Sequence, residues 1–314
     1  AMDHDLGVTL ASAGLALREV GRAGRGLVAT RDFRCGEVIW QEQGLRARNP
    51  ESLAKAVLQS EEVRAATAHL YAGPLCHLQG WDGGLPEGVK DEEWADVYSK
   101  VRFNCFEQNG SCLLPIMALF NHSCAPNAAI THLGPDEDCR FAMVAVTASG
   151  ICEGTEIAYS YNSECMFASW RERQQRLMAN WSFICRCNRC EEEQDTAVES
   201  DGEAEEDFDC LLSREDSSLL ARKLFEARAS LLHHPGLPFG QRKQLFSTQL
   251  AAATALLPCL HPALVPILEE LRDLCEPSAH LRHAEQVCQF FSDLQSKGTA
   301  TWPPEDEPFI AAEA

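Results

Sequence analysis

Residues 121–127 read NHSCAPN, and they follow directly on the apolar run LLPIMALF at 113–120. The apolar run predicts a buried segment, which places the polar cluster at the edge of a core. Polar side chains in such a position can cap a helix, with Asn121 or Ser123 accepting a backbone N–H, or they can belong to a binding site. Residues 121–127 alone favour the cap, and only motifs elsewhere in the chain favour a site.

A second decisive stretch is CRCNRC at residues 185–190. Thiolates are soft ligands, and tetrahedral zinc accepts four of them at about 2.3 Å. The triplet therefore predicts a structural zinc site that lacks one ligand locally. Spacing leaves Cys124, Cys165 and Cys210 open as the fourth ligand. The alternative is that the triplet is incidental, since isolated cysteines are usually small buried apolar residues.

Two further motifs are GRAGRGL at 21–27 and GTEIAYSY at 154–161. The glycines of the first permit the backbone to come close to a ligand, although such a turn alone is more often a hairpin loop. Tyr159 and Tyr161 in the second motif, taken alone, are typical of strand residues packed in a sheet. Neither motif decides a function by itself.

In this order, the glycine turn, NHSCAPN, GTEIAYSY and FICRCNRC at 183–190 resemble a SET-domain lysine methyltransferase. The NHSC segment and the closing CxCxxC are most similar to the SMYD (SET and MYND) branch. The resemblance covers residues 15–190 by motif and the remainder by helical character. It implies an α+β fold: a SET-domain β-fold with a helical insert and a zinc-binding post-SET segment, followed by an all-helical C-terminal domain.

The chain departs from that branch in one respect. A MYND zinc finger needs about eight Cys and His ligands, and the corresponding segment offers only His69, Cys76 and His77. We therefore expect no MYND finger, and its partner-peptide and DNA-binding roles are not carried over.

The resemblance implies that S-adenosylmethionine is the cofactor, with S-adenosylhomocysteine as product, and that a lysine is the acceptor. The implied cofactor-binding residues are Ala23, Gly24, Arg25, Asn121, His122, Tyr161 and Phe183. The implied lysine channel consists of Tyr159, Trp181 and Phe183. Asn104 and Phe106 match a less specific Asn-x-Phe that often precedes the NHSC segment.

Tyr161 and Tyr159 are the implied catalytic residues. The phenol of Tyr161 can orient the amine and the methyl group through O–H and weak C–H···O contacts. The hydroxyl of Tyr159 would hold a water in space that further methyl groups need, which predicts mainly mono- or dimethyllysine. The same resemblance selects Cys124 over Cys165 and Cys210 as the fourth zinc ligand, beside the CRCNRC cysteines Cys185, Cys187 and Cys190.

Hydrophobic periodicity and turn residues predict the organisation of the chain. The expected segments are the N-terminal part of the SET domain (15–47), the helical insert (48–100), the C-terminal part of the SET domain (101–180), the post-SET zinc segment (181–190), an acidic linker (191–209) and the helical C-terminal domain (210–300). The linker holds eleven acids and no Lys or Arg, so we expect it to be disordered.

The composition limits the partners. A net charge of −20 argues against a nucleic-acid surface and favours a basic partner, such as a lysine-containing peptide or a histone tail. Fifteen cysteines, an odd number, predict reduced thiols and one metal site. No apolar run of about 18 residues predicts a membrane span. Ala1 before Met2 resembles an expression scar, and we expect a soluble nuclear or cytoplasmic protein.

Two alternatives to a histone methyltransferase stay open. One is a catalytically silent SET fold that serves as a protein-interaction module, against which the retention of Tyr161, Asn121, His122 and the glycine turn argues. The other is an enzyme for a dedicated non-histone protein, as in plant-type SET enzymes with a helical C-terminal domain. Those enzymes commonly lack the CxCxxC closure.

Overall fold

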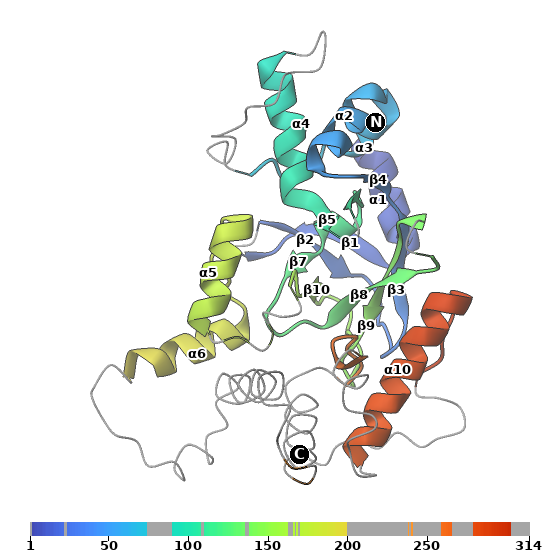
Figure 1. Ribbon diagram of the computed structural model, residues 1–314, viewed down its shortest axis with the longest axis vertical. Coiled ribbons are helices and arrows are strands. Elements are labelled where there is room, and N and C mark those ends of the chain that lie inside the picture. Colours follow the sequence, from blue (N-terminus) through green and yellow to red (C-terminus); the bar gives the residue numbers. More distant parts are fainter. Residues whose placement is uncertain are drawn as a thin grey trace.

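The computed structural model describes residues 2–21, 24–73, 90–107, 110–135, 138–162, 166, 168, 170–199, 238, 240, 259–265 and 279–302. These residues form an α+β fold in which short strands occupy the centre and helices surround them (Figure 1). No helix among them is long and apolar enough to cross a membrane.

The described strands form four small sheets. They are β1 (Leu15–Glu19) with β2 (Arg25–Ala29); β3 (Val38–Gln43) with β9 (Arg140–Ala145) and β8 (Ala128–Leu133); β4 (Leu45–Ala47) with β6 (Ser111–Leu113) and β5 (Cys105–Glu107); and β10 (Ala158–Tyr159) with β7 (Asn121–His122). The pair of β7 and β10 is parallel, and the other pairs are antiparallel. The parallel pair sets His122 beside Tyr159.

Strand β9 separates two hydrophobic cores. Its sequence, RFAMVA, is apolar at every position after Arg140, and those positions are all buried. Successive side chains of a strand point to opposite faces. Phe141 and Met143 therefore join the core beneath the candidate site, whereas Ala142 and Val144 join a second core on the other face.

Helices cover both cores. Helix α1 (Met2–Ser12), which no sequence expectation covered, buries Leu10 in the first core. The second core is covered by residues 259–265 and by α10 (Ala279–Lys297), which lies against β8 (Figure 1). Most of the helical C-terminal domain expected over 210–300 lies outside the described residues.

The described part of the insert is helical, as expected. It contains α2 (Pro50–Gln59), α3 (Glu61–Ala66) and α4 (Asp91–Asn104). A short 3-10 helix, η3 (Met117–Leu119), precedes the NHSC segment, and Glu42 holds its start by accepting hydrogen bonds from the backbone N–H groups of Ile116 and Met117.

The prediction of a disordered acidic linker over 191–209 is wrong for its first half. Helix α6 (Asn188–Glu199) continues through residues 191–199, after α5 (Trp170–Trp181). The acids do not keep this segment unfolded because Glu193 pairs with Arg173 and Arg189 at 2.7 and 2.8 Å. Residues 200–209 lie outside the described residues.

The expectation that all thiols are reduced is also wrong for one pair. Cys112 on β6 and Cys139, which directly precedes β9, form a disulfide. The backbone N–H of Gly44 donates to the carbonyl of Cys139 at 2.9 Å, and a Cβ at Gly44 would lie 2.6 Å from the sulfur of Cys112. The connection between β3 and β4 therefore brings the two cysteines together, which spacing along the chain does not reveal.

A candidate active site next to a cysteine cluster

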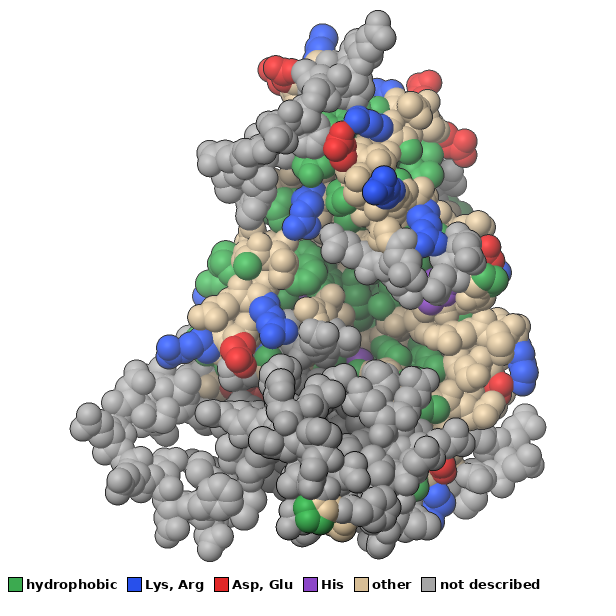
Figure 2. All heavy atoms as spheres, in the orientation of Figure 1, with side chains coloured by type: hydrophobic (Ala, Val, Ile, Leu, Met, Phe, Trp, Pro, Cys, Tyr) green, Lys and Arg blue, Asp and Glu red, His purple; other side chains and the backbone are tan. Residues whose placement is uncertain are grey.

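A cavity of about 1180 Å³ opens where the glycine turn, the NHSC segment, β10 and the post-SET segment meet. Figure 2 shows hydrophobic side chains gathered around a recess near the centre of this face. The predicted site residues that line the cavity are Gly24, Arg25, Asn121, His122, Tyr161, Trp181 and Phe183, together with Asn104. Ala23 lies outside the described residues.

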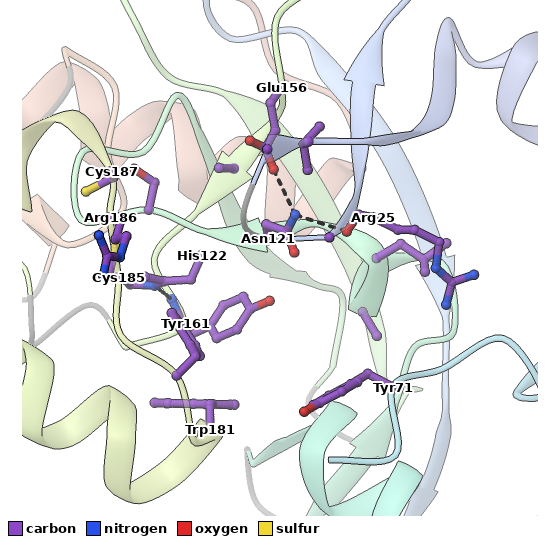
Figure 3. Close-up of a pocket in the computed structure, with 18 of the residues that line it drawn as sticks. Arg25, Tyr71, Asn121, His122, Glu156, Tyr161, Trp181, Cys185, Arg186 and Cys187 are labelled. Atoms are coloured by element: carbon purple, nitrogen blue, oxygen red, sulfur yellow. Dashed lines mark hydrogen bonds between the residues drawn. The ribbon is translucent and has the colours of Figure 1, made fainter. Parts of the chain in front are cut away.

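The glycine turn is held against the NHSC segment through Asn121. Its Nδ2 donates to the carbonyl of Arg25 at 3.1 Å and to Oε1 of Glu156 at 2.8 Å (Figure 3). A Cβ at Gly26 would lie 2.5 Å from that nitrogen, so only glycine permits the approach. Gly24 has a φ of +77°, which also favours glycine.

The helix-cap interpretation of Asn121 does not hold. Asn121 lies on strand β7, and its side-chain nitrogen donates rather than accepting a backbone N–H. Ser123 does accept, from the N–H of Ala125 at 3.1 Å, but this contact shapes the turn after β7.

His122 joins Tyr161 to the cysteines. Its Nδ1 accepts the backbone N–H of Tyr161 at 3.1 Å (Figure 3). Its Nε2 lies 3.3 Å from the sulfur of Cys124. Burial lowers the pKa of His122 to about 4, against the opposing charge of Cys187. The imidazole is therefore neutral at pH 7. Since Nδ1 accepts, Nε2 carries the proton and donates it toward the sulfur.

Tyr161 stands in an aromatic cluster. Its ring centroid lies 5.1 Å from that of Tyr159, 5.4 Å from Trp181 and 6.2 Å from Phe183. Its hydroxyl donates to the carbonyl of Phe120 at 3.1 Å. Burial raises the pKa of Tyr161, the charge of Glu156 raises it further, and burial also raises the pKa of Tyr159. Both phenols are therefore protonated at neutral pH.

A second cavity, of about 650 Å³, adjoins the first at this cluster. Both cavities are lined by Phe103, Asn104, Ala118, Tyr161 and Trp181. Tyr159 lines the second, and so does Phe106, whose ring stacks on Tyr159 with centroids 6.3 Å apart. Tyr161 thus lies at the boundary between two separate binding volumes.

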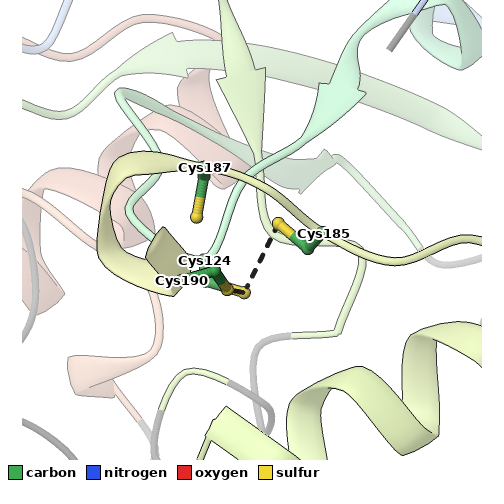
Figure 4. Close-up of side chains that lie close together, drawn as sticks. All are labelled: Cys124, Cys185, Cys187 and Cys190. Carbon is green, nitrogen blue, oxygen red and sulfur yellow. Dashed lines mark hydrogen bonds between the residues drawn. The ribbon is translucent and has the colours of Figure 1, made fainter. Parts of the chain in front are cut away.

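The cysteine cluster has the geometry of a metal site. The four sulfurs of Cys124, Cys185, Cys187 and Cys190 all lie within 4.8 Å of one another (Figure 4). The sulfur of Cys124 is 3.9 Å from that of Cys185 and 3.6 Å from that of Cys190. Four sulfurs around one zinc at about 2.3 Å would be about 3.8 Å apart. Cys165 and Cys210 lie outside the described residues.

A fully buried arginine stands beside the cluster. The guanidinium of Arg173 is 3.6 Å from the sulfur of Cys190 and 2.7 Å from Glu193. Burial alone would lower the pKa of Arg173, but the charges of Cys124 and Glu193 raise it, so it remains a cation. Arg189 adds a hydrogen bond to the carbonyl of Cys124 at 3.2 Å. These cations would offset the negative charge of the thiolates if the cluster held a metal ion.

Sequence reasoning missed several residues of the first cavity. Glu156 lies inside GTEIAYSY, so the motif itself could have identified it. Tyr71 is 62% exposed and contacts Phe103 edge to face, and no motif marks either residue. His69, counted above as a candidate finger ligand, lines the cavity and accepts a hydrogen bond at its carbonyl from Arg25.

Comparison with known proteins identifies the domain, because the family model for the SET domain matches residues 24–162. The chain carries a SET domain. Its relatives include the protein-lysine N-methyltransferase SMYD4 of Mus musculus, 35% identical over 81 residues, which are 26% of this chain and 9% of SMYD4. The histone-lysine N-methyltransferases ATXR2 and ASHR2 of Arabidopsis thaliana are 31% and 28% identical, over 35% of this chain and 23% and 30% of theirs.

The SET domain predicted from the motifs is confirmed, and so is its likeness to lysine methyltransferases. The chain spans less than a third of the length of each of these relatives, between 9% and 30%. The matched residues hold the glycine turn from Gly24 onward, the NHSC segment and both tyrosines, whereas the CxCxxC triplet follows them.

Proposed function

We propose that this SET domain transfers a methyl group from S-adenosylmethionine to the side chain of a lysine in a protein. The observation that carries the proposal is the position of Tyr161 between two cavities. A displacement reaction needs two ligands that approach each other in line. One cavity can hold the methyl donor and the other the chain that brings the lysine.

The first cavity suits the cofactor in size and chemistry. Ligand pockets usually measure about 300–1,000 Å³, and this cavity, at about 1180 Å³, is slightly larger and has room for a ligand of the cofactor's size. Gly24, Arg25, Asn121 and His122 would hold the cofactor from one side and Phe183 from the other, while the carboxylate of Glu156 offsets positive charge. When bound, the cofactor would supply a methyl group on a sulfonium. The S–C bond breaks as the N–C bond forms, and the sulfur keeps the electron pair of the broken bond.

The described residues position the lysine but do not deprotonate it. Its nitrogen attacks through a free electron pair, so the ammonium must first lose a proton. Tyr159 and Tyr161 cannot take that proton at neutral pH, because burial raises both pKa values. We therefore expect the proton to leave to solvent. Trp181 and the two phenol rings surround the lysine stem, exclude water and face its charge.

The cysteine cluster supports a structural zinc ion. Four thiolates leave no open position for water or substrate, so such an ion takes no part in the reaction. Cys185 and Cys187 follow the aromatic residues Trp181 and Phe183, and Cys124 belongs to the NHSC segment. A zinc ion there would fix the aromatic wall against the cofactor cavity.

We further propose a basic peptide, such as a histone tail, as substrate, in line with the net charge of −20, and mono- or dimethyllysine as product. Incubation with radiolabelled cofactor, with histones in one sample and a whole-cell extract in another, tests the activity. Calorimetric titration with S-adenosylmethionine tests binding separately. Label on protein lysines supports the proposal, whereas no cofactor binding by the folded, zinc-loaded chain would favour an interaction module.

A further inference from the structure

Two cysteines outside the metal cluster lie close together. The sulfur of Cys35 is 3.3 Å from the sulfur of Cys259, although 224 residues separate them in sequence. Cys35 precedes β3, and Cys259 begins the segment 259–265 that covers the second core. A disulfide bond is about 2.05 Å long, so the two sulfurs need to move little more than about 1 Å to bond.

Backbone hydrogen bonds hold both cysteines in place. The N–H of Gly36 donates to the carbonyl of Ala145 at 2.8 Å, and the N–H of Leu260 donates to the carbonyl of Val146 at 3.1 Å. Each cysteine is therefore followed in sequence by a residue that is hydrogen-bonded to the backbone at the end of β9. Their proximity follows from the packing of two segments and not from side-chain placement alone.

We propose that Cys35 and Cys259 form a disulfide when the protein meets a peroxide, and that this bond ties the segment 259–265 to the SET domain. No third Cys, His, Asp or Glu completes a metal site with this pair among the described residues. Both thiols are half-buried, so a small oxidant can reach them while bulkier thiols are disfavoured. The bond itself does not depend on methyl transfer.

One molecule of hydrogen peroxide oxidises the pair of thiols to one disulfide and is itself reduced to two molecules of water. The hydrogen bond between the thiols, the first cause of both shifts, lowers the pKa of Cys259 and raises that of Cys35. The thiolate of Cys259 attacks one peroxide oxygen, giving a sulfenic acid and hydroxide. The thiol of Cys35 then attacks that sulfur and loses its proton. The sulfenic oxygen leaves as hydroxide, and both hydroxides become water.

The disulfide would fix one part of the wall of the second cavity. His261, Pro262 and Ala263 directly follow Leu260 and line that cavity together with the aromatic cluster. Leu260 and Leu264 anchor the same segment in the second core. Among the described residues, this packing and a few hydrogen bonds hold the wall in the reduced protein, whereas in the oxidised protein a covalent bond holds it as well.

Peptide mapping tests the disulfide directly. Trypsin releases Cys35 in the peptide 35–46 and Cys259 in the peptide 244–272, and each peptide contains no other cysteine. The full chain is treated with hydrogen peroxide, alkylated and digested without reductant. We expect the two peptides to be joined, with the loss of two hydrogen atoms, and to separate on reduction.

Variants provide the controls. Cys35→Ser and Cys259→Ser should each abolish the joined peptide, whereas Cys152→Ser, which removes an exposed free thiol, should leave it unchanged. Oxidation should also raise the unfolding temperature of the wild type and of Cys152→Ser, but not that of Cys35→Ser or Cys259→Ser. If the wild type instead yields Cys35 and Cys259 as separate sulfinic acids, or both remain alkylatable after Cys152 has been oxidised, the proposal is wrong.

Discussion

Among the described residues, the hydroxyl of Tyr161 donates its hydrogen bond to the carbonyl of Phe120. The hydroxyl hydrogen is used in that bond, and the oxygen still has two lone pairs that can accept a hydrogen bond from a lysine amine. The backbone N–H of the same residue is fixed by His122. Tyr161 is thus held at two points, one on the main chain and one on the ring.

Tyr161→Phe should lower kcat by about 100-fold, which is the size of the loss seen when one hydrogen-bonding group that stabilises a transition state is removed. Cofactor affinity should change by less than about threefold, because the ring remains. Tyr98→Phe is a matched control, since Tyr98 stacks on Trp94 in a separate core. Rate measurements and calorimetry on both variants check this, and an unimpaired Tyr161→Phe enzyme would remove Tyr161 from the reaction.

Tyr159→Phe should shift the products toward trimethyllysine. Removing the hydroxyl frees space at the wall where Tyr159 faces Tyr161 and Phe106. Mass spectrometry of a methylated peptide over time measures the distribution. Efficient trimethylation by the wild type, unchanged in the variant, would contradict the role given to Tyr159.

His261 should make folding depend on pH. Burial lowers its pKa from about 6.5 to about 4, and its Nδ1 accepts the N–H of Ala263, so protonation costs that bond. The unfolded chain binds the proton more readily. Stability is therefore full above pH 6.5 and falls as the pH drops from 6.5 through 4, by about 3 kcal/mol. Urea unfolding should show His261→Asn, which keeps an acceptor without a charge, losing less over this range than the wild type.

At the scale of elements, α5 and α6 carry the cations that face the cysteine cluster. Arg173→Met should release zinc about tenfold faster to a chelator, because the charge of the thiolates is then less well offset. Arg171→Met, an exposed change on the same helix, should have no effect. A metal-sensitive dye follows the release. Glu193→Gln removes the ion pair of Arg173 but keeps its cation. Zinc release close to the wild-type rate in this variant would show that the effect of Arg173 on the cluster does not depend on the ion pair with Glu193.

Short-range patterns predicted the elements best. The four motifs could be found because each lies within a few consecutive residues. The break between α2 and α3 is less visible: Ser60 ends one helix and caps the next through the N–H of Val63. The acids of α6 indicated disorder because their partner Arg173 lies on another helix.

The same distinction holds for the site. Its motif residues, such as Asn121 and Tyr161, were predicted through the resemblance. Tyr71 comes from the insert and Phe103 from the last turn of α4, and only packing brings them to the cavity. The disulfide of Cys112 with Cys139 could not be predicted either, since it depends on the connection between β3 and β4. Contacts between distant segments leave no local pattern.

At the scale of the whole molecule, the two cores on either side of β9 support different parts of the site. The first core supports the cofactor side of the site through η3 and β10, and it includes Tyr159. The second core joins the outer face of β9 to residues 259–265 and α10. A ligand in the second cavity would touch both, because Phe141 belongs to the first core and Ala129 to the second.

The parallel pair of β7 and β10 also governs when the site can form during synthesis. Asn121 bonds a residue 96 positions earlier and another 35 positions later, and the cysteine cluster waits for Cys190. Pairings so distant in sequence fold slowly. A growing chain therefore carries its glycine turn for 96 residues before Asn121, which secures it, has been made. Nascent chains that end before Cys190 should be cut readily by proteases, and those long enough to expose it should resist.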